Sequence, residues 1–502
     1  MQKGIISFVF FFLFYHLSLP AQTTMSKAEM YEDFDQFVEI VQKYNPQLAV
    51  RKAVTGYDAM GYIVSMRSCI DTIQNPASFY VLMKGAVNSL ADIHSYTLSV
   101  MTPRPLIRAL WQYNTFTEVD TNVLYRAASI LWKSNNSPFF SFGNYLLYYD
   151  GGYYIIGDVI LWGDNVSIRL NDKKLVKVAG TDVDQWLRQN MHRQIGNAMR
   201  WDFSKGKYYS NSMILPKGEI TVRDMHTGRD SAVNLSLYTS FQFQSKAGVF
   251  TKKDFSKRLV FYYPEEQLLY LRFPQMEEGL QRKLIREIRH ALGHHMPQKI
   301  VLDVRNNPGG SDDVWTDVVQ YLIGDTIYMP VRVGIRAQED YLAFYRKASE
   351  EELEPYSFLE EQYYVLKHGV CALVPAKNNI GYQGKFYVLQ NRGTLSAAHS
   401  LSSLHRYSDR FVTVGEPTGT IAGRGGGPAL FQLKHSGITF AMECDIDFTN
   451  AEKPEDVYQD AVDVPVKCTL EEAERSSFSG SNRSKSYLLE RDPYFKAVLE
   501  LK

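Results

Sequence analysis

From about residue 259 the chain alternates between short apolar segments and amphipathic segments with a helical period. Strands are expected at 268–273, 299–304 and 385–390, and helices at 281–292, 314–323 and 396–406. Strands that alternate with helices pair in parallel, and helices must cover the faces of their sheet. The pattern therefore predicts an α/β fold for this part of the chain.

Two further regions precede the α/β part. Residues 25–100 carry apolar residues at a spacing of three to four, which is typical of helices. Residues 145–240 consist mostly of short strands, with hairpin turns at Asp150-Gly151-Gly152 and at His226-Thr227-Gly228. We therefore expect an N-terminal helical region at 25–100, a β-rich middle module at 145–240 and an α/β domain at 259–500.

Residues 1–21 have the layout of a secretory signal peptide. Lys3 precedes an apolar run, and Pro20 and Ala21 follow that run. An uncleaved membrane anchor is the alternative, but the run is shorter than a segment that spans a bilayer. We expect an exported protein, periplasmic or extracellular, with no integral membrane span after removal of the signal.

The charge and the cysteines exclude several classes of protein. Lys+Arg and Asp+Glu both number 55, so the chain lacks the basic excess that binding to nucleic acid requires. The four cysteines form no C-x-x-C pair, and we expect small buried side chains, with a Cys444–Cys468 disulfide left open. His290 and His294 have helical spacing but lack the Glu of a zincin helix. We therefore expect no metal and no cofactor.

Two strand ends in the α/β part carry residues that are suited to catalysis. The strand at 299–304 leads into Asn306-Asn307-Pro308-Gly309-Gly310. Adjacent glycines allow backbone N–H groups to face a bound group, and such donors stabilise a carbonyl oxygen that becomes an oxyanion. Taken alone, the same residues also describe an ordinary tight turn.

The second strand end leads into a serine. After the strand at 385–390 comes a Gly-containing turn and then Ser396-Ala397-Ala398. This order places the Ser396 hydroxyl at the start of a helix, with the N–H of Ala397 beside it. A serine in this position is also a common N-cap. The two strand ends together favour a nucleophile, Ser396, beside an oxyanion hole formed by Gly309, Gly310 and Ala397.

At these residues the sequence resembles peptidase family S41, which includes the tail-specific processing proteases and the tricorn-type proteases. The resemblance rests on residues 303–310, on Ser396-Ala397-Ala398 with His399 in place of the family's Glu, on Gly415-Glu416-Pro417-Thr418, on Asp92-Ile93-His94-Ser95 and on residues 491–497. It implies a crotonase/ClpP-like catalytic domain. The family often carries a PDZ-like module, and residues 175–183 in the middle module resemble one of its strands loosely.

The resemblance offers two candidates for the general base. In the tail-specific branch a Lys takes this role, but Ile421 stands at its position and the neighbouring Arg424 stays protonated at any working pH. The tricorn-like branch uses a His from the N-terminal region, which points to His94. His399, three residues after Ser396, is the weaker alternative.

Three residues remain candidates for the acid that would orient the histidine: Glu455, Asp456 and Glu416. We predict an exported serine peptidase, a hydrolase that acts on peptides or proteins without a cofactor. The alternative is a catalytically inactive protein of the same fold that binds peptides or small apolar ligands. It is motivated by the absent Lys, by His399 in place of Glu and by the unassigned acid.

Overall fold

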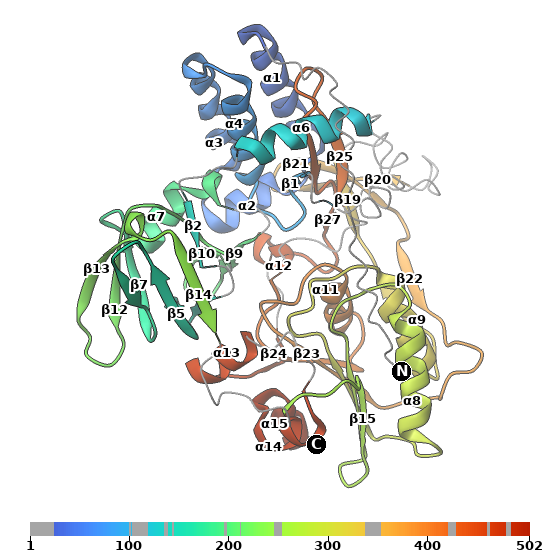
Figure 1. Ribbon diagram of the computed structural model, residues 1–502. Coiled ribbons are helices and arrows are strands. Elements are labelled where there is room, and N and C mark those ends of the chain that lie inside the picture. Colours follow the sequence, from blue (N-terminus) through green and yellow to red (C-terminus); the bar gives the residue numbers. More distant parts are fainter. Residues whose placement is uncertain are drawn as a thin grey trace, which may run out of the picture.

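The computed structural model describes most of the chain in three units (Figure 1). The described residues are 25–99, 102, 119–134, 139–142, 145–194, 198–210, 212–244, 254–336, 353–419, 428–458, 462–477 and 483–501. The predicted signal peptide at 1–21 lies outside them, as do Ile421 and Arg424. Among the helices within these ranges, none is both long and apolar enough to cross a membrane.

A six-stranded sheet forms the centre of the α/β unit. In spatial order its strands are β15 (Val260–Tyr263), β16 (Leu268–Arg272), β17 (Lys299–Asp303), β23 (Lys385–Gln390), β24 (Phe411–Gly415) and β28 (Val464–Pro465). β15 is antiparallel to β16, and every other neighbouring pair is parallel. The predicted α/β fold with parallel pairing is confirmed, and each of the three predicted strands agrees with an observed strand to within one residue.

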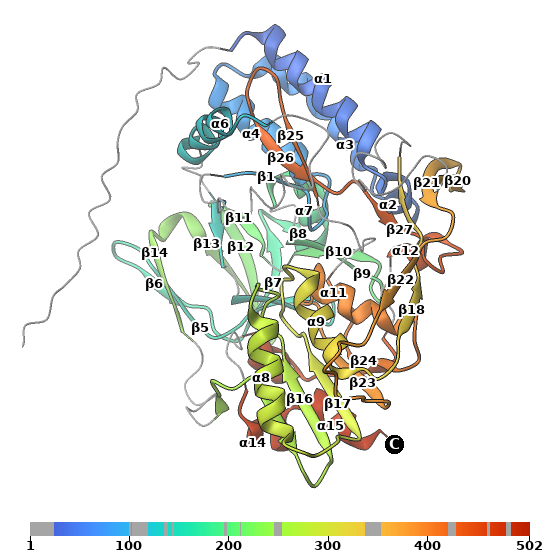
Figure 2. The ribbon, with the colours of Figure 1, turned by 90° about the vertical axis from the view of Figure 1, so that its right-hand side faces the viewer.

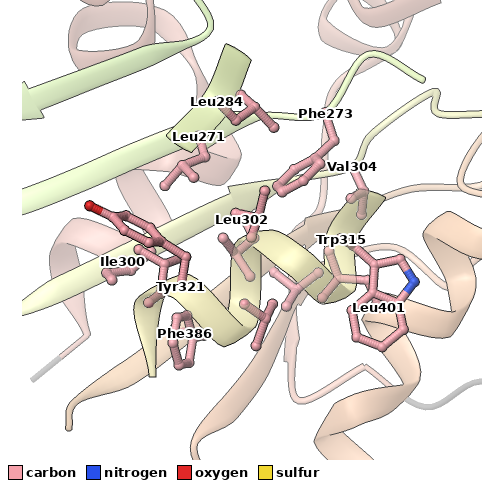
Figure 3. Close-up of a cluster of buried hydrophobic side chains, with 14 of the residues drawn as sticks. Leu271, Phe273, Leu284, Ile300, Leu302, Val304, Trp315, Tyr321, Phe386 and Leu401 are labelled. Carbon is pink, nitrogen blue, oxygen red and sulfur yellow. The ribbon is translucent and has the colours of Figure 1, made fainter. Parts of the chain in front are cut away.

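Helices cover both faces of this sheet, because side chains alternate between the faces along each strand. On one face lie α8 (Leu280–Leu292), α9 (Asp312–Leu322) and α11 (Ala397–Ser402), and on the other lie α14 (Lys485–Arg491) and α15 (Pro493–Glu500). Figure 3 shows Leu302 of β17 and Phe386 of β23 in the first layer, where Trp315 of α9 lies beside Leu401, on the opposite side of the view from Phe386. Val301, the residue between Ile300 and Leu302, packs on the opposite face with α14 and α15.

The N-terminal unit is helical, as predicted. Its elements are α1 (Lys27–Tyr44), α2 (Leu48–Thr55), α3 (Ala59–Ser65), the 3₁₀ helix η1 (Met66–Thr72), α4 (Pro76–Asn88) and α6 (Thr121–Ser134). Asn75 caps α4, since its side chain accepts a hydrogen bond from the N–H of Ser78 at 2.9 Å. Pro76 occupies the first turn of α4, where its missing N–H costs nothing.

A hairpin from late in the chain completes the core of this helical unit. Its strands β25 (Ala429–Gln432) and β26 (Thr439–Met442) form a sheet with β1 (Tyr96–Thr97). Phe440 packs edge-on against Phe37 of α1, with the ring centroids 5.2 Å apart. Both views show the orange-red hairpin among the blue helices (Figures 1 and 2). The segment 429–442 thus leaves the α/β sheet, although it lies within the 259–500 part of the chain.

The middle module contains two sheets, a helix and two short strand pairs. One sheet has the order β13-β12-β7-β4-β3 with β8 beside β7, and the other has the order β14-β5-β6. Its elements are β2 (Phe139–Ser141), β3 (Leu146–Tyr149), β4 (Gly152–Ile155), β5 (Asp158–Trp162), β6 (Ser167–Arg169), β7 (Lys173–Val178), β8 (Thr181–Asp182), α7 (Val183–Gln189), β9 (Met199–Asp202), β10 (Lys207–Ser210), β11 (Ile214–Pro216), β12 (Glu219–Asp224), β13 (Asp230–Asn234) and β14 (Ser240–Gln244). Both predicted hairpins, β3–β4 and β12–β13, are present.

The remaining elements lie between and after the strands of the α/β sheet. They are β18 (Ile327–Pro330), β19 (Val333–Ile335), β20 (Leu353–Phe358), β21 (Glu361–Leu366), β22 (Val370–Leu373), β27 (Ile446–Asp447), α12 (Pro454–Tyr458) and α13 (Leu470–Ser477). All four cysteines are free, which answers the open question of a disulfide. The expectation of burial is wrong for Cys69 and Cys371, which are exposed.

The layer between the sheet and α8–α9 gives a test of stability. Leu302 is fully buried in this layer, so Leu302→Ala removes three carbon atoms from a site that cannot collapse (Figure 3). We expect the free energy of unfolding to fall by about 2–5 kcal/mol, measured by urea denaturation. Val370→Ala is the matched control, because Val370 is 62% exposed, and its effect should stay within about 0.5 kcal/mol.

Candidate active site

Two turns at the carboxyl ends of β17 and β23 are joined by hydrogen bonds. The N–H of Asn306 donates to Asn391 Oδ1 at 2.9 Å, and Asn391 Nδ2 donates back to Asn306 Oδ1 at 3.0 Å. The N–H of Leu395 donates to the carbonyl oxygen of Asn307 at 2.9 Å. Adjacent parallel strands bring their carboxyl ends to the same edge of the sheet, and these bonds then hold the turns in one arrangement.

Ser396 lies at the end of the second turn in a strained backbone conformation. Its φ is 50° and its ψ is −127°, a region that residues with a Cβ seldom occupy. Its side chain does not cap α11, so the simple N-cap interpretation does not hold. The turn instead directs the hydroxyl away from the helix backbone. The Oγ atom lies 3.2 Å from Nε2 of His94.

The turn that carries His94 is held by a buried aspartate. Asp92 Oδ1 accepts a hydrogen bond from the N–H of His94 at 3.0 Å, and Oδ2 accepts one from the Ser95 hydroxyl at 2.6 Å. Arg51, which is fully buried, lies 3.8 Å from the same carboxylate. The imidazole therefore projects from a fixed turn between α4 and β1.

The second ring nitrogen of His94 contacts a carboxylate that the sequence did not single out. Nδ1 of His94 makes a hydrogen bond with Oε2 of Glu443, the residue that directly follows β26. The register of the β1–β26 pair explains this contact. Tyr96 lies opposite Ala441, and extending the antiparallel pairing by two residues places His94 opposite Glu443 on the same face.

The carboxylates around His94 favour its protonated form. Burial alone would lower the pKa of His94, but Glu443 and Asp92 outweigh burial and hold that pKa above its ordinary value of 6.5. For Glu443, burial would raise the pKa, but His94, Asp445 and the N–H of Cys444 lower it below its ordinary value. The raised pKa of His94 and the lowered pKa of Glu443 are consistent with each other, and together they describe a buried pair in which Glu443 is ionised.

Two residues of the expected oxyanion hole, Gly309 and Ala397, lie beside Ser396. A Cβ on Gly309 would lie 2.6 Å from Cβ of Ser396 and 3.1 Å from the nitrogen of Ala397. The N–H of Gly309, however, donates to Asn307 Oδ1 at 2.8 Å, so Gly309 provides space and not a donor. The N–H groups of Gly310 and Ala397 are then the candidate donors of this site.

The three acids that the sequence left open lie elsewhere. Glu455 and Asp456 belong to α12, which packs against α2, and Asp456 Oδ2 accepts hydrogen bonds from two backbone N–H groups of its own turn. Glu416 follows β24, and its Oε1 lies 3.9 Å from Nε of Arg392. The only signal for Glu443 in the sequence is a charged residue directly after the apolar run 438–442.

His399, the alternative base, has a different partner. Its Nδ1 lies 2.9 Å from Oγ1 of Thr418, and its side chain is buried in α11. His399 thus joins the nucleophile helix to the Gly415–Thr418 segment. Within the described ranges, no group of three His, Cys, Asp or Glu side chains has an arrangement that could hold a metal ion.

A buried ion-pair network supports the strand end that carries the glycines. Asp303 is bound by Arg305 at 2.7 Å and by Arg272 at 3.2 Å. Arg305 also makes two bonds of 2.9 Å to Asp492, which caps α15 through the N–H groups of Tyr494 and Phe495. The sequence motifs at 303–310 and 491–497 thus meet in one network. Burial opposes ionisation of Asp303, but the two guanidinium groups lower its pKa well below the usual range.

Part of the chain matches a known protein family, and the chain is similar in structure to solved proteins. Residues 267–450 match peptidase family S41. Among solved structures, the chain is similar to mature CPAF, with 14% identity and a TM-score of 0.52, over 90% of this chain and 95% of that chain. It is also similar to the photosystem II D1 C-terminal processing protease, with 14% identity and a TM-score of 0.37, over 88% and 94% of the two chains. The chain matches no curated protein sequence. The likeness to CPAF shows a shared fold, and the family match confirms the resemblance to family S41.

The His94–Glu443 pair predicts a measurable titration. In Glu443→Gln the ionised carboxylate is lost while burial stays, so the pKa of His94 should fall from above 6.5 to below it. The measurement is NMR of the protein with labelled histidine. His192, whose pKa burial lowers to about 4, is the internal control and should not shift. A His94 pKa that does not change on substitution would contradict the pairing.

Proposed function

We propose that this chain, whose residues 267–450 match peptidase family S41, hydrolyses peptide bonds with Ser396 as nucleophile, His94 as general base and Glu443 as the acid that orients His94. One observation carries the proposal. A single imidazole lies 3.2 Å from the serine hydroxyl through Nε2 and contacts a buried carboxylate through Nδ1. This is the arrangement that a serine nucleophile requires for activation.

The geometry supports a two-step acyl transfer. Oγ of Ser396 attacks the carbonyl carbon of the peptide bond, and its proton passes to Nε2 of His94. Glu443 accepts the Nδ1–H, so that in the neutral imidazole Nε2 carries the lone pair that takes the proton, and it stabilises the imidazolium that then forms. His94 then gives the proton to the leaving amine, and the acyl-enzyme forms. Water hydrolyses the acyl-enzyme by the same route, which regenerates Ser396.

The developing oxyanion would lie between the N–H groups of Gly310 and Ala397. Gly310 has a φ of 137°, and a Cβ there would lie 2.1 Å from the carbonyl oxygen of Met276, so the position demands glycine. Backbone donors that are held before the reaction begins stabilise the transition state without reorganising. The joined turns provide this rigidity.

Two of the three observations that motivated the alternative, an inactive binding protein, have another explanation in this geometry. The acid is supplied by Glu443, and His399 has a structural contact with Thr418. The absent Lys is accounted for if His94 is the base. The peptidase proposal is therefore the one that the geometry favours, with peptides or proteins as substrates.

The wider expectations from sequence also belong to this proposal. We infer that residues 1–21 direct export to the periplasm or outside the cell, and that 25–100, 145–240 and 259–500 are the working units of the mature chain. The crotonase/ClpP-like assignment of the catalytic domain and the PDZ-like assignment of the middle module rest on the same resemblance.

The first test is covalent labelling of the serine. A fluorophosphonate probe should label the wild-type chain at Ser396, and Ser396→Ala should abolish the labelling. His94→Ala should slow it by about 10³-fold or more, because the hydroxyl then lacks its base. The site of labelling is read by mass spectrometry of the peptide that contains Ser396.

His435→Gln is the matched control for His94. His435 also pairs with a glutamate, Glu32, at 2.7 Å, but on the surface of the N-terminal unit. Its substitution should leave the labelling rate unchanged. Wild-type protein that is folded but labels no faster than Ser396→Ala would refute the proposed nucleophile.

The second test concerns the space beside the nucleophile. In Gly309→Ala the new Cβ would lie 2.6 Å from Cβ of Ser396 at a φ of 95°, so the turn must shift. We expect the rate of peptide hydrolysis to fall by at least about 10²-fold. Gly228→Ala is the control, since Gly228 has a φ of 69° with open space around it. Equal losses in the two variants would mean that backbone strain alone explains the effect.

A further inference from the structure

Arg392 reaches from the nucleophile turn into the middle module. It lies four residues before Ser396, in the turn that joins β23 to α11. Its Nη1 donates to Asp202 Oδ2 of β9 at 3.2 Å. Its guanidinium carbon lies 5.3 Å from the ring centroid of Tyr148 in β3 and 5.2 Å from that of Tyr209 in β10. One side chain of the catalytic turn therefore binds three residues of another unit.

The residues that contact Arg392 are also held in place by contacts that do not involve Arg392. The rings of Tyr148 and Tyr209 are stacked, with centroids 4.1 Å apart and an interplanar angle of 11°. The hydroxyl of Tyr148 donates to Asp202 Oδ2 at 2.8 Å. Oδ1 of Asp202 accepts hydrogen bonds from the N–H and the hydroxyl of Ser204, at 2.9 and 2.6 Å. We call Tyr148, Asp202 and Tyr209 the arginine-binding cluster.

Electrostatics favour an ionised pair at this cluster. Asp202 is buried, and burial would raise its pKa, but Ser204 and Arg392 outweigh burial and lower it. Burial would likewise lower the pKa of Arg392, but Tyr209, Glu416 and Asp202 hold it above its usual range. A planar guanidinium that stacks on rings and binds a buried carboxylate is a contact that Lys cannot reproduce.

The same part of the middle module also contacts the segment beside the turn. In the β9–β10 pair, Arg200 lies opposite Tyr209. A Cβ on Gly419 would lie 2.9 Å from Nε of Arg200 and 2.3 Å from the carbonyl oxygen of Arg392. The N–H of Gly419 donates to the carbonyl oxygen of Thr394 at 3.1 Å. The β9–β10 hairpin thus contacts this part of the chain in two places, through Asp202 at Arg392 and through Arg200 at Gly419.

We propose that Arg392 is a positioning residue, which holds the strained Ser396 turn against the arginine-binding cluster so that Oγ stays within reach of His94. This inference rests on the proposed function of Ser396 and His94. A strained backbone persists only where its surroundings over-determine it. The bonds to Asn306 and Asn307 hold the turn from the α/β domain, and Arg392 holds it from the middle module. The middle module is then part of the catalytic apparatus without touching the substrate's reacting bond.

The experiment compares Arg392→Gln, Arg392→Lys and Asp202→Asn with wild type. We expect Arg392→Gln to lower the fluorophosphonate labelling rate and kcat by about 10–100-fold, with KM changed by less than about threefold, because the turn is misplaced and not the substrate site. Arg392→Lys should restore only part of the rate, since Lys keeps the charge but not the planar stack. The double variant Arg392→Gln/Asp202→Asn should be no slower than Arg392→Gln alone.

Arg223→Gln is the matched control. Arg223 forms a bidentate pair with Asp230 in the same module, at 2.7 and 3.1 Å, far along the β12–β13 hairpin. Its loss should leave the labelling rate unchanged. If Arg223→Gln and Arg392→Gln slow labelling equally, general weakening of the module explains the result and the inference is overturned.

Hydrogen–deuterium exchange separates this inference from the proposed function. In Arg392→Gln, the peptide that spans 391–397 should exchange at least about tenfold faster, while β17 stays as protected as in wild type. Faster exchange at 391–397 supports the positioning role even if wild-type Ser396 proves unreactive, an outcome that would refute only the proposed function. Unchanged exchange together with unchanged labelling would overturn the role of Arg392.

Discussion

The pairing of β1 with β26 is the contact on which the geometry around His94 depends. Only two residues of β1 pair in the ladder, yet their register sets Glu443 against His94. A slip of one residue would turn either side chain to the opposite face. The apolar residues of the β25–β26 hairpin prevent such a slip, since Phe440 and Phe431 are buried among the N-terminal helices. Packing among the N-terminal helices therefore fixes the contact between His94 and Glu443.

A second constraint acts on the nucleophile. The parallel strands β17 and β23 deliver two turns to one edge of the sheet, and reciprocal bonds between Asn306 and Asn391 join them. This frame allows Ser396 to keep a φ of 50° and allows glycine to approach it closely. The strained backbone of Ser396 persists because the joined turns are rigid. In this conformation the hydroxyl of Ser396 contacts His94 and does not cap α11.

Local patterns predicted the α/β domain well. The strands around 299–303 and 385–390 and the turn before Ser396 all depend on residues close in sequence. Glu443 could not be found in this way, because its position follows from the register of two strands that are more than 300 residues apart. The bond from the N–H of Gly309 to the side chain of Asn307, two residues earlier, is by contrast a local Asx turn, a contact that Asn commonly forms. The sequence also could not predict that residues 429–442 pack into the core of the N-terminal helices, because this contact depends on tertiary packing.

The hairpin inserted among the N-terminal helices has a consequence for biosynthesis. The helices α1 and α4 are made first, but the strands that bury their apolar faces are made last. During synthesis this surface of the N-terminal helices therefore stays uncovered until the hairpin has been made, and contacts of such long range form slowly. Since Glu443 directly follows the same hairpin, His94 and Glu443 can meet only after the helical unit has closed around the hairpin. The His94–Glu443 contact therefore cannot form in a nascent chain until residue 443 has been made and the hairpin has packed.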